Sequence, residues 1–414
     1  MPEVLIVADD LTGAADCGIA FAARGFATLV TLGEAGGVDG ADVLAIDADT
    51  RAQSRAAAAR ETARLVARFG PSSGALFKKI DSTLRGHVGS EVAAALTAWR
   101  SATGSGLVVM TPAFPALGRT TRGGRLFIRG VPLENTDLGR CSGRALPSDV
   151  PRLLADAGLR TTAVGLDVLR SDPGHLHTVL AARAEGCDAL ASDAETDDDL
   201  RALVVSARAL ERSVVWAGSA GLARLLAEVM GAGRSHRRAL GAPVAEGPIL
   251  FVVGSPSDVS RAQVAALASE PTVVVVTVST RTQTWPESGV RLAAALASGK
   301  DTVVAIEARG PVDAGDGGPF AAALGRFLAP HAQGAGALVL TGGETARAVL
   351  EAIGVSKLRL VGEIEPGVPL SATDGPVRSA VITKAGAFGN RETLIRCRAA
   401  LRNPKPESGT SASA

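Results

Sequence analysis

The stretch Lys-Lys-Ile-Asp-Ser-Thr-Leu-Arg-Gly at 78–86 groups two amines, a carboxylate, two hydroxyls and a guanidinium. An apolar run at 74–77 leads into it, which predicts a strand ending in a polar turn. Burying such groups unpaired costs several kcal/mol, roughly 2 to 7 for each. Arg and Lys can hold a small anion, and Asp81 can accept a proton from a hydroxyl. The alternative is a solvated strand end where Ser82 and Thr83 cap a helix.

Two adjacent carboxylates, Asp9 and Asp10, follow the strand predicted at 4–8, where a helix begins. Ligands of open parallel sheets bind beyond the carboxyl ends of the strands. The pair could accept hydrogen bonds from vicinal hydroxyls or position a divalent ion. Helix capping is the alternative, although two aspartates exceed what a cap requires.

Strand alternation sorts two other groups of polar residues. It predicts that Asp47, Asp49 and Arg51 share one side of their strand end. Arg51 is then a candidate clamp for a carboxylate, and a local pair with Asp49 is equally compatible. Alternation also places Lys79 with Asp81 and turns Lys78 to the opposite face, which favours Lys79 as the amine of a site.

Three glycine-rich turns follow predicted strands in the second half, at 254–257, 342–346 and 384–389. Glycine lets a backbone approach a ligand, and amides that open a helix point at negative charge. The candidate contacts are Ser255, Ser257, Gly342, Gly343, Glu344, Thr345 and Gly386. Three such turns predict a phosphate or nucleotide cradle, although none fits a P-loop or dinucleotide fingerprint. A similar turn at 218–221 could meet an anion or could serve tight packing.

Short apolar strands alternate with alanine-rich helices, which predicts two α/β domains with largely parallel sheets and an interdomain cleft. The expected domains span residues 1–230 and 249–402. A Gly-, Pro- and Arg-rich linker at 231–248 separates them, and the tail at 403–414 has the composition of a disordered segment. The segment 112–147 breaks the rhythm and predicts a long irregular lid or substrate loop. The predicted strands are Val4–Ala8, Thr28–Leu32, Val43–Asp47, Ala75–Ile80, Leu107–Thr111, Thr162–Leu166, Ala189–Ser192, Ser213–Ala217, Ile249–Val253, Thr272–Val278, Thr302–Glu307, Ala337–Thr341 and Ala380–Thr383, with helices at Ala52–Phe69 and Ser90–Trp99.

Composition argues against several classes of partner. The 414 residues carry 43 basic and 42 acidic side chains, so no basic excess would attract nucleic acid. No apolar run approaches the length of a membrane span. The four cysteines are far apart and lack metal spacing, which fits thiols of a reducing cytoplasm. A homodimer is left open.

Taken together, these segments resemble the four-carbon acid sugar kinase family over about residues 4–398. The shared motifs lie at 8–14, 78–86, 112–120, 342–345, 363–369 and 384–389. The form of the 78–86 motif is most similar to the branch that phosphorylates threonate or erythronate, whereas other branches act on 3-oxo-tetronates. Two departures stand out: Ala385 and Ala387 replace polar side chains usual in the last turn, and the 137–144 segment lacks the expected Asp-Pro.

The resemblance implies that ATP and Mg²⁺ serve as cofactors and that a hydroxyl of a small sugar acid, its terminal one, is phosphorylated. The domain at 1–230 would bind the sugar acid, and the domain at 249–402 would bind the nucleotide. Ser257, the 342–345 turn and Gly386 would contact ATP. The sugar acid would lie among Asp9, Asp10, Arg51, Lys79, Asp81, Arg85 and Gly86. Asp81 would orient or deprotonate the attacking hydroxyl, with Asp10 as the alternative base. Arg85, with Lys79 or Arg51, would anchor the carboxylate.

Two other functions remain as alternatives. The substituted 384–389 turn and the altered 137–144 segment are what a non-catalytic sensor of sugar acids or nucleotides would carry, although Asp10, Asp81 and Arg85 argue for catalysis. A kinase of the same family acting on a 3-oxo-tetronate or a longer or branched acid is the other. A nicotinamide-dependent dehydrogenase would share the architecture but lacks the fingerprint.

Overall fold

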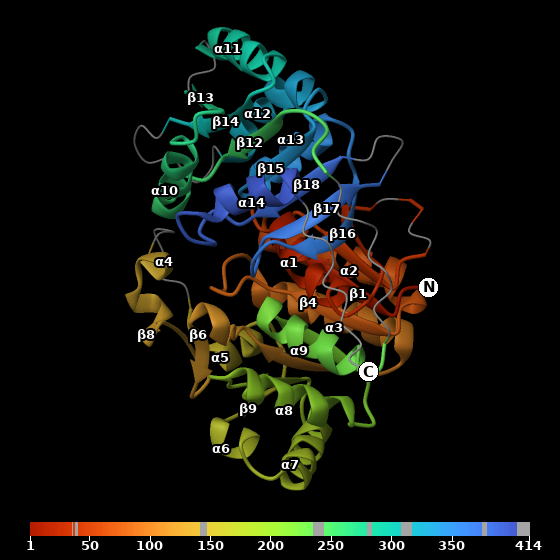
Figure 1. Cartoon of the computed structure of the whole chain (residues 1–414). Helices are drawn as coiled ribbons and strands as arrows, with labels where there is room; N and C mark the ends of the chain where they lie inside the picture. Colours follow the sequence, from red (N-terminus) through yellow and green to blue (C-terminus); the bar gives the residue numbers. More distant parts are fainter. Residues whose placement is uncertain are drawn as a thin grey trace, which may run out of the picture. The chain divides into compact units, whose positions relative to one another are not determined.

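The computed structural model describes residues 1–34, 36–37, 40–140, 147–234, 244–279, 284–307, 317–374 and 379–403. The chain divides into two compact units, Met1–Arg237 and Arg238–Ala414. Figure 1 colours the first from red to green and the second from green to blue. Residues 235–243, which are half of the predicted linker, and the predicted tail beyond residue 403 lie outside the described residues.

The described part of the first unit contains a parallel sheet in the order β2-β3-β1-β4-β11-β5-β10-β9. These strands are buried runs rich in Val, Leu, Ile and Ala, as a sheet covered on both faces requires. The predicted strands match them within two residues at each end. They are β1 (Val4–Ala8), β2 (Thr28–Leu32), β3 (Val43–Asp47), β4 (Ala75–Lys79), β5 (Leu107–Thr111), β9 (Thr161–Val164), β10 (Ala189–Ser192) and β11 (Val214–Gly218).

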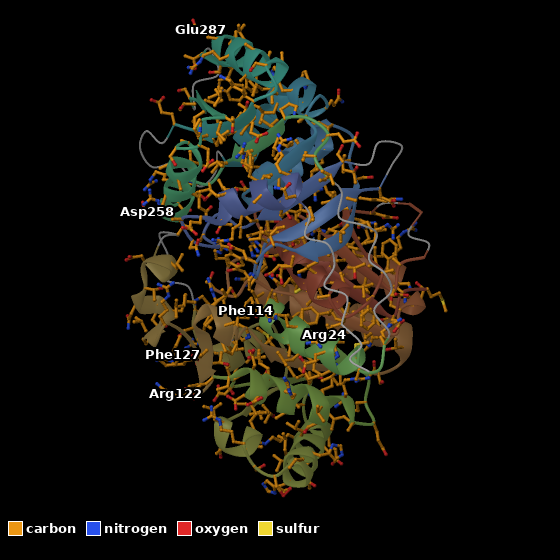
Figure 2. All side chains as sticks on the ribbon, in the orientation of Figure 1. Arg24, Phe114, Arg122, Phe127, Asp258 and Glu287 are labelled. Atoms are coloured by element: carbon orange, nitrogen blue, oxygen red, sulfur yellow. The ribbon has the colours of Figure 1, made fainter. Side chains whose placement is uncertain are left out.

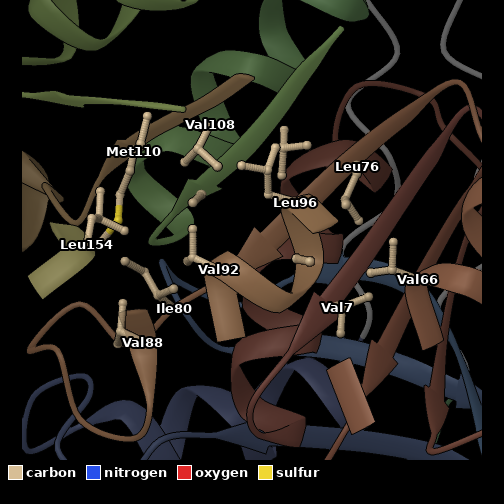
Figure 3. Packing of buried hydrophobic residues seen from close by; sticks show 14 of the residues in the cluster. Val7, Val66, Leu76, Ile80, Val88, Val92, Leu96, Val108, Met110 and Leu154 are labelled. Atoms are coloured by element: carbon tan, nitrogen blue, oxygen red, sulfur yellow. The ribbon is translucent and has the colours of Figure 1, made fainter. Parts of the chain in front are cut away.

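Helices cover this sheet on both faces. Leu5 and Val7 of β1 belong to a core cluster beneath α2 and α3, part of which Figure 3 shows around Val92. Alternation turns Ile6 to the other face, where α1 packs on α9 and α9 on α8. Side chains cap most of these helices, and Thr196 and Asp199 form a complete capping box for α8. The helices are α1 (Leu11–Ala22), α2 (Arg55–Phe69), α3 (Val88–Thr103), α5 (Val150–Ala155), α6 (Leu166–Leu169), α7 (Pro173–Glu185), α8 (Asp197–Arg208) and α9 (Ala220–Met230).

The prediction of a long irregular segment at 112–147 is wrong for its described part. It forms an antiparallel sheet of β6 (Arg119–Arg122), β7 (Arg125–Ile128) and β8 (Val131–Pro132), followed by the short helix α4 (Asp137–Arg140). Gly123 and Gly124 have φ of 59° and 72°, which suits the tight turn of a β6–β7 hairpin. The hydrophobic pattern did not predict this hairpin, because many of its strand residues are polar or charged.

The second unit has a sheet in the order β13-β14-β12-β15-β18-β17-β16. The first five strands are parallel, whereas β17 runs antiparallel to β18 and β16. Sequence analysis missed β16 and β17, because neither strand has an apolar run: β16 mixes charged and apolar residues, and the largely buried β17 opens with Pro369 and contains Ser and Thr. The α/β class with largely parallel sheets is confirmed. The elements are β12 (Ile249–Val253), α10 (Asp258–Leu267), β13 (Val273–Val278), α11 (Trp285–Ala297), β14 (Asp301–Ile306), α12 (Gly317–Ala332), β15 (Ala337–Thr341), α13 (Gly343–Ala352), β16 (Lys357–Glu363), β17 (Pro369–Thr373), β18 (Ala380–Lys384) and α14 (Thr393–Arg402).

A buried polar network ties the helices to the strand ends in the first unit. The Lys78 ammonium on β4 lies 3.5 Å from the Glu91 carboxylate on α3. Thr50, directly after β3, donates to the same carboxylate at 2.5 Å, and Thr62 of α2 donates at 3.3 Å. All four side chains are buried. The network therefore fixes the backbone at Thr50 and Lys78, which directly precede Arg51 and Lys79.

Replacing Glu91 by Leu should destabilise the protein by about 3 to 5 kcal/mol, because the Lys78 ammonium would stay buried without its carboxylate. The double variant Lys78→Met/Glu91→Leu should recover most of that loss. Urea unfolding followed by tryptophan fluorescence, to which Trp99 and Trp216 of this unit contribute, measures both. A double variant as unstable as the single one would assign the loss to packing instead of the unpaired charge.

Candidate functional site

The first sheet has a topological switch point at β1. After β1 the chain builds β2 and β3 on one side, and β4 then joins on the other side. Ala8 at the end of β1 lies in register with Asp47 of β3 and Lys79 of β4, so the three strands end together. Ligands of open α/β sheets bind at such a point. The polar residues singled out at 9–10, 51 and 81–86 follow these three strands.

Arg51 joins the ends of these strands. Its Nε and Nη2 atoms donate to the two carboxylate oxygens of Asp9 at 2.7 and 2.9 Å. Its Nη1 donates to Asp10 at 2.8 Å, and Nη2 lies 3.7 Å from Asp81. Arg51 therefore clamps carboxylates of the protein itself.

The prediction that Asp47, Asp49 and Arg51 share one side is wrong. Strand β3 ends at Asp47, and Asp49 has a φ of 50°, which breaks the alternation. Asp47 is accordingly buried while Asp49 is exposed.

Asp81 is held by hydrogen bonds from several sides. Arg85 donates through Nε at 2.9 Å and through Nη2 at 2.8 Å. The amide of Thr83 donates at 3.0 Å, and its hydroxyl donates to the same oxygen. Burial alone would raise the pKa of Asp81, but Arg85 and Arg51 outweigh it and hold the pKa well below the ordinary value. Asp81 is thus an ionised, firmly oriented hydrogen-bond acceptor.

Lys79 and Lys78 point as strand alternation predicts. Lys79 Nζ lies 2.9 Å from where a Cβ on Gly13 would stand, so glycine in the first turn of α1 makes room for it. Burial would lower the pKa of Lys79, but carboxylates that include Asp9 and Asp10 raise it above the ordinary value. Lys78 faces Glu91 in the core instead. Lys79 is therefore the charged amine beside the aspartates.

Asp10 has two structural roles at once. It caps α1 by accepting from the Gly13 amide at 2.9 Å, which supports the capping interpretation, and it also receives Arg51. Burial alone would raise its pKa, but Arg51 and Lys79 hold the pKa below the ordinary value. Gly86 closes the group: its φ is 86°, and a Cβ there would lie 3.2 Å from Asp9.

The predicted site residues of the first unit therefore lie together: Asp9, Asp10, Arg51, Lys79, Asp81, Arg85 and Gly86. The aspartates are largely buried, whereas half of the Arg85 side chain is exposed. This arrangement offers cations for a small anion and oriented oxygens for hydroxyl groups.

The 218–221 turn fits the packing interpretation. The Ser219 hydroxyl donates to the carbonyl of Ala113 at 2.7 Å and accepts from the Gly221 amide at 3.1 Å. A Cβ on Gly221 would lie 2.5 Å from the same carbonyl. Glycine and serine are therefore needed here to bring α9 against the chain after β5.

The second sheet has its own switch point between β12 and β15, where the glycine-rich turns converge. A Cβ on Gly254 would lie 1.9 Å from the Thr345 hydroxyl, and one on Gly386 would lie 2.0 Å from that of Ser255. The neighbouring turns therefore require these two glycines. Gly342 differs: its φ is 99°, and no atom comes within 3.7 Å of the same position. It precedes α13, which begins without a side-chain cap.

The Gly386 carbonyl is fixed by three donors. The hydroxyls of Ser257 and Ser260 donate to it at 2.9 and 2.8 Å, and Lys384 Nζ lies 3.4 Å away. Because a trans peptide points its C=O and N–H in opposite directions, the Ala387 amide points away from these donors. This backbone arrangement holds although Ala385 and Ala387 lack polar side chains.

Three residues with contacts in these regions were not singled out from the sequence: Ser260, Lys384 and Arg119. Ser260 follows Ser257 by three residues, and its amide donates to the Ser257 hydroxyl as in a helix cap. Its own hydroxyl donates to the Gly386 carbonyl, and the cap spacing does not reveal this second contact. Lys384 and Arg119 lie inside the family motifs at 384–389 and 112–120. Their positions at the end of β18 and the start of β6 could have marked them as candidate site residues.

The described residues contain neither a membrane-spanning helix nor a cluster of metal ligands. No helix there is long and apolar enough to cross a membrane. Nor do three or more His, Cys, Asp or Glu side chains gather there as a metal ion would require.

Comparisons with known proteins match nearly the whole chain. A family model described as a sugar-binding N-terminal domain matches residues 4–226, and one described as a nucleotide-binding C-terminal domain matches 250–394. A D-threonate kinase of Cupriavidus necator is 40% identical over 94% of this chain and 96% of its own length. A D-threonate kinase of Bordetella bronchiseptica is 33% identical, with 97% and 98% covered. A 3-oxo-tetronate kinase of Methylobacterium radiotolerans is 31% identical, with 94% and 97% covered.

Solved structures share the fold. A crystal structure of a Salmonella typhimurium protein superposes with a TM-score of 0.80 at 22% identity, covering 95% of this chain and 98% of that one. A Bordetella bronchiseptica structure, described as a domain-swapped dimer with bound citrate, is 32% identical with a TM-score of 0.50 and covers 97% and 99%.

Lys384 should make stability depend on pH in a defined window. Burial lowers its pKa from 10.5 to about 8. Between these values the unfolded chain holds a proton that the folded chain lacks, so Lys384 by itself contributes an increase in unfolding free energy with pH, by up to about 3 kcal/mol. Buried thiols such as Cys17 and Cys397, whose pKa values are raised, act in the opposite direction, and they are common to the wild type and the variants. Urea unfolding from pH 7 to 10.5 should therefore show the unfolding free energy of the wild type rising relative to that of Lys384→Met. Relative to Lys300→Met, which alters an exposed lysine, the wild type should show no such change; a rise relative to both variants would contradict the assignment to Lys384.

Proposed function

This chain belongs to the four-carbon acid sugar kinase family, and from that premise we propose that it is an ATP-dependent kinase whose acceptor is D-threonate. The observation that carries the proposal is the convergence of three aspartates, Lys79 and two arginines where β1, β3 and β4 end. Relatives at 40% and 33% identity are named D-threonate kinases, which favours that acid over the alternatives.

In the first unit, the sugar acid would lie against the carboxylates and cations after β1 and β4. Asp81 would accept a hydrogen bond from the attacking hydroxyl, which we take to be the terminal one. Its lowered pKa makes it a weak base, so it orients the hydroxyl more than it deprotonates it. Phosphoryl transfer depends mainly on positioning and charge neutralisation, so a weak base suffices. Asp10 is the alternative base, but it already caps α1 and binds Arg51.

In the second unit, ATP would bind beside Gly342 and α13, and when bound it supplies the γ-phosphoryl group. The glycine backbone at Gly342, with a φ of 99°, and the uncapped start of α13 suit a phosphate, since amides that open a helix point at negative charge. The Ala387 amide, aimed by the fixed Gly386 carbonyl, would be a further donor. Ser255, Ser257 and Thr345 would act mainly by holding the turns together, because their hydroxyls lie against neighbouring turns.

The described residues offer no dedicated Mg²⁺ site. The site carboxylates Asp9, Asp10 and Asp81 are paired with arginines, and no other suitable cluster occurs among the described residues. Mg²⁺ often keeps several waters and binds substrate phosphates with few protein ligands. Mg²⁺ would accordingly accompany the phosphates of ATP.

The remaining proposals concern the setting. A reaction that consumes ATP fits the cytoplasm, and fractionation of cells would test that location. A homodimer is the assembly we propose, because a relative of 32% identity is described as a domain-swapped dimer. Light scattering at micromolar concentration would distinguish a dimer from a monomer.

Purified protein with ATP and Mg²⁺ should release ADP fastest with D-threonate. L-threonate, D-erythronate and a 3-oxo-tetronate are the acids for comparison, and a coupled assay measures ADP release with each acid. A higher kcat/KM for the 3-oxo-tetronate would replace the substrate and keep the kinase. No acid-dependent ADP release from folded protein would overturn the function and favour the sensor.

Replacing Asp81 by Asn should lower kcat by about 10²- to 10⁴-fold, because the oriented acceptor for the hydroxyl is lost. The KM for ATP should stay within about two-fold, since Asp81 and the nucleotide turns belong to different units. Circular dichroism and thermal unfolding would show that the variant folds. Near-normal turnover in a folded variant would remove Asp81 from the mechanism.

A further inference from the structure

Lys384 joins two glycine-rich turns of the second unit. It is the last residue of β18, and its carbonyl accepts a hydrogen bond from the Gly342 amide at 2.9 Å. Its side chain reaches back to the turn that follows, where Nζ donates to the carbonyls of Ala385 and Gly386 at 2.9 and 3.4 Å. Only 1% of the residue is exposed. Lys384 therefore supports the 384–389 turn from the interior of the unit.

Two successive carbonyls of this turn are directed at one ammonium group. A trans peptide points its C=O and its N–H in opposite directions, so the amides of Gly386 and Ala387 point away from Lys384. Neither amide has a hydrogen-bond acceptor among the described residues. Successive amides that point the same way form a concave site for an anion. The orientation of these two amides therefore depends on what holds the carbonyls behind them.

Helix α10 holds the same turn with neutral groups. The helix begins at Asp258, which Figure 2 labels, and two serine hydroxyls at this end donate to the Gly386 carbonyl. The side-chain amide of the buried Gln263 donates to the carbonyls of Phe388 and Asn390, each at 3.0 Å. Hydroxyl and amide donors bring no net charge. Lys384 is thus the charged donor to the carbonyls of this turn.

The Lys384 ammonium has no carboxylate partner among the described residues. Glu365 acts on it electrostatically, but the Glu365 carboxylate already accepts from Arg396 Nε at 2.7 Å. Cys397 of α14 is a neutral thiol, because burial raises its pKa to about 12. The Thr341 hydroxyl, on the strand paired with β18 here, is buried and has no partner among the described residues. Burial therefore dominates and lowers the pKa of Lys384 to about 8, and a nearby anion would stabilise its charged form.

We propose that Lys384 is a positioning residue for the phosphates of the nucleotide, because it directs two peptide groups of the 384–389 turn and places a positive charge behind them. The amides of Gly386 and Ala387 would contact the phosphate, and Lys384 would act on it through these peptides. This rests on the proposed kinase function. A phosphate that stabilises the ammonium also makes it hold its proton more tightly, so nucleotide binding is coupled to proton uptake. The polar side chains missing at Ala385 and Ala387 are not needed for this device.

The dissociation constant for ATP should therefore depend on pH in the wild type. A phosphate that favours the charged form of Lys384 about ten-fold should make the Kd rise about five-fold between pH 7 and pH 9. The phosphate groups themselves, with a second pKa of about 6, stay ionised over this range. Isothermal titration calorimetry with ATP and Mg²⁺, in the absence of a sugar acid, measures the Kd without turnover. A Kd that stays constant over this range would overturn the proposal.

Proton uptake is a second measurement on the wild type, and it needs no variant. The heats of ATP binding at pH 8.5, in two buffers with different enthalpies of protonation, should give an uptake of about half a proton per nucleotide. Binding without proton uptake would overturn the proposal even if every variant failed to fold.

Replacing Lys384 by Met should raise the Kd for ATP about ten-fold at pH 7, because the charge behind the turn is lost. The Kd should then be nearly independent of pH, and binding should take up no proton. The matched control is Lys300→Met, which removes an exposed lysine of the same unit and should keep the wild-type pH dependence and proton uptake. If Lys384→Met raises the Kd but keeps the pH dependence of the wild type, Lys384 has a structural role only, and the proposal is overturned.

Failure of this inference can be told from failure of the kinase function. A wild type that binds ATP and phosphorylates a sugar acid, but takes up no proton on binding ATP, overturns the role of Lys384 alone. A folded wild type that binds no ATP overturns the proposed function and this inference with it.

Discussion

The contact between Arg51 and the two aspartates after β1 is the interaction on which the first unit's site depends. Two carboxylates in sequence repel each other, and burial increases the repulsion because the local dielectric constant falls. Arg51 offsets this from a loop 41 and 42 residues away. Its planar guanidinium fits both oxygens of Asp9 and one of Asp10, which fixes the orientation of the carboxylates as well as their charge. Arg85 does the same for Asp81.

The core behind the site uses the same backbone. Lys78 and Lys79 are neighbours, yet one faces Glu91 in the interior and the other faces the aspartates. Thr50, bonded to Glu91, directly precedes Arg51. A shift in the buried network would therefore be transmitted to the site within one residue. Placement of the site cations is in this sense a property of the core.

Features that depend on local sequence could be predicted. Buried apolar runs located the parallel strands of both sheets, and alternation assigned Lys79 correctly. Features that depend on distant contacts could not. The partners of Arg51, and of the Gly386 carbonyl, come from other strand ends. Strand β17 opens with Pro369, and β6 consists of Arg and Thr, so neither has the apolar pattern of a strand. The positive φ of Asp49 could not be predicted either, because positive φ is uncommon for residues other than glycine.

The contacts between the glycine-rich turns of the second unit limit how this chain can change. Glycine is required at 254 because the Thr345 side chain stands opposite, and at 386 because the Ser255 side chain does. Any larger residue at one member of a pair needs a smaller one at the other. Efforts to alter nucleotide preference by single substitutions in these turns would therefore disturb a second turn as well. Libraries that vary both members of a pair together, and keep glycine at Gly342, where φ is 99°, would sample far more folded variants.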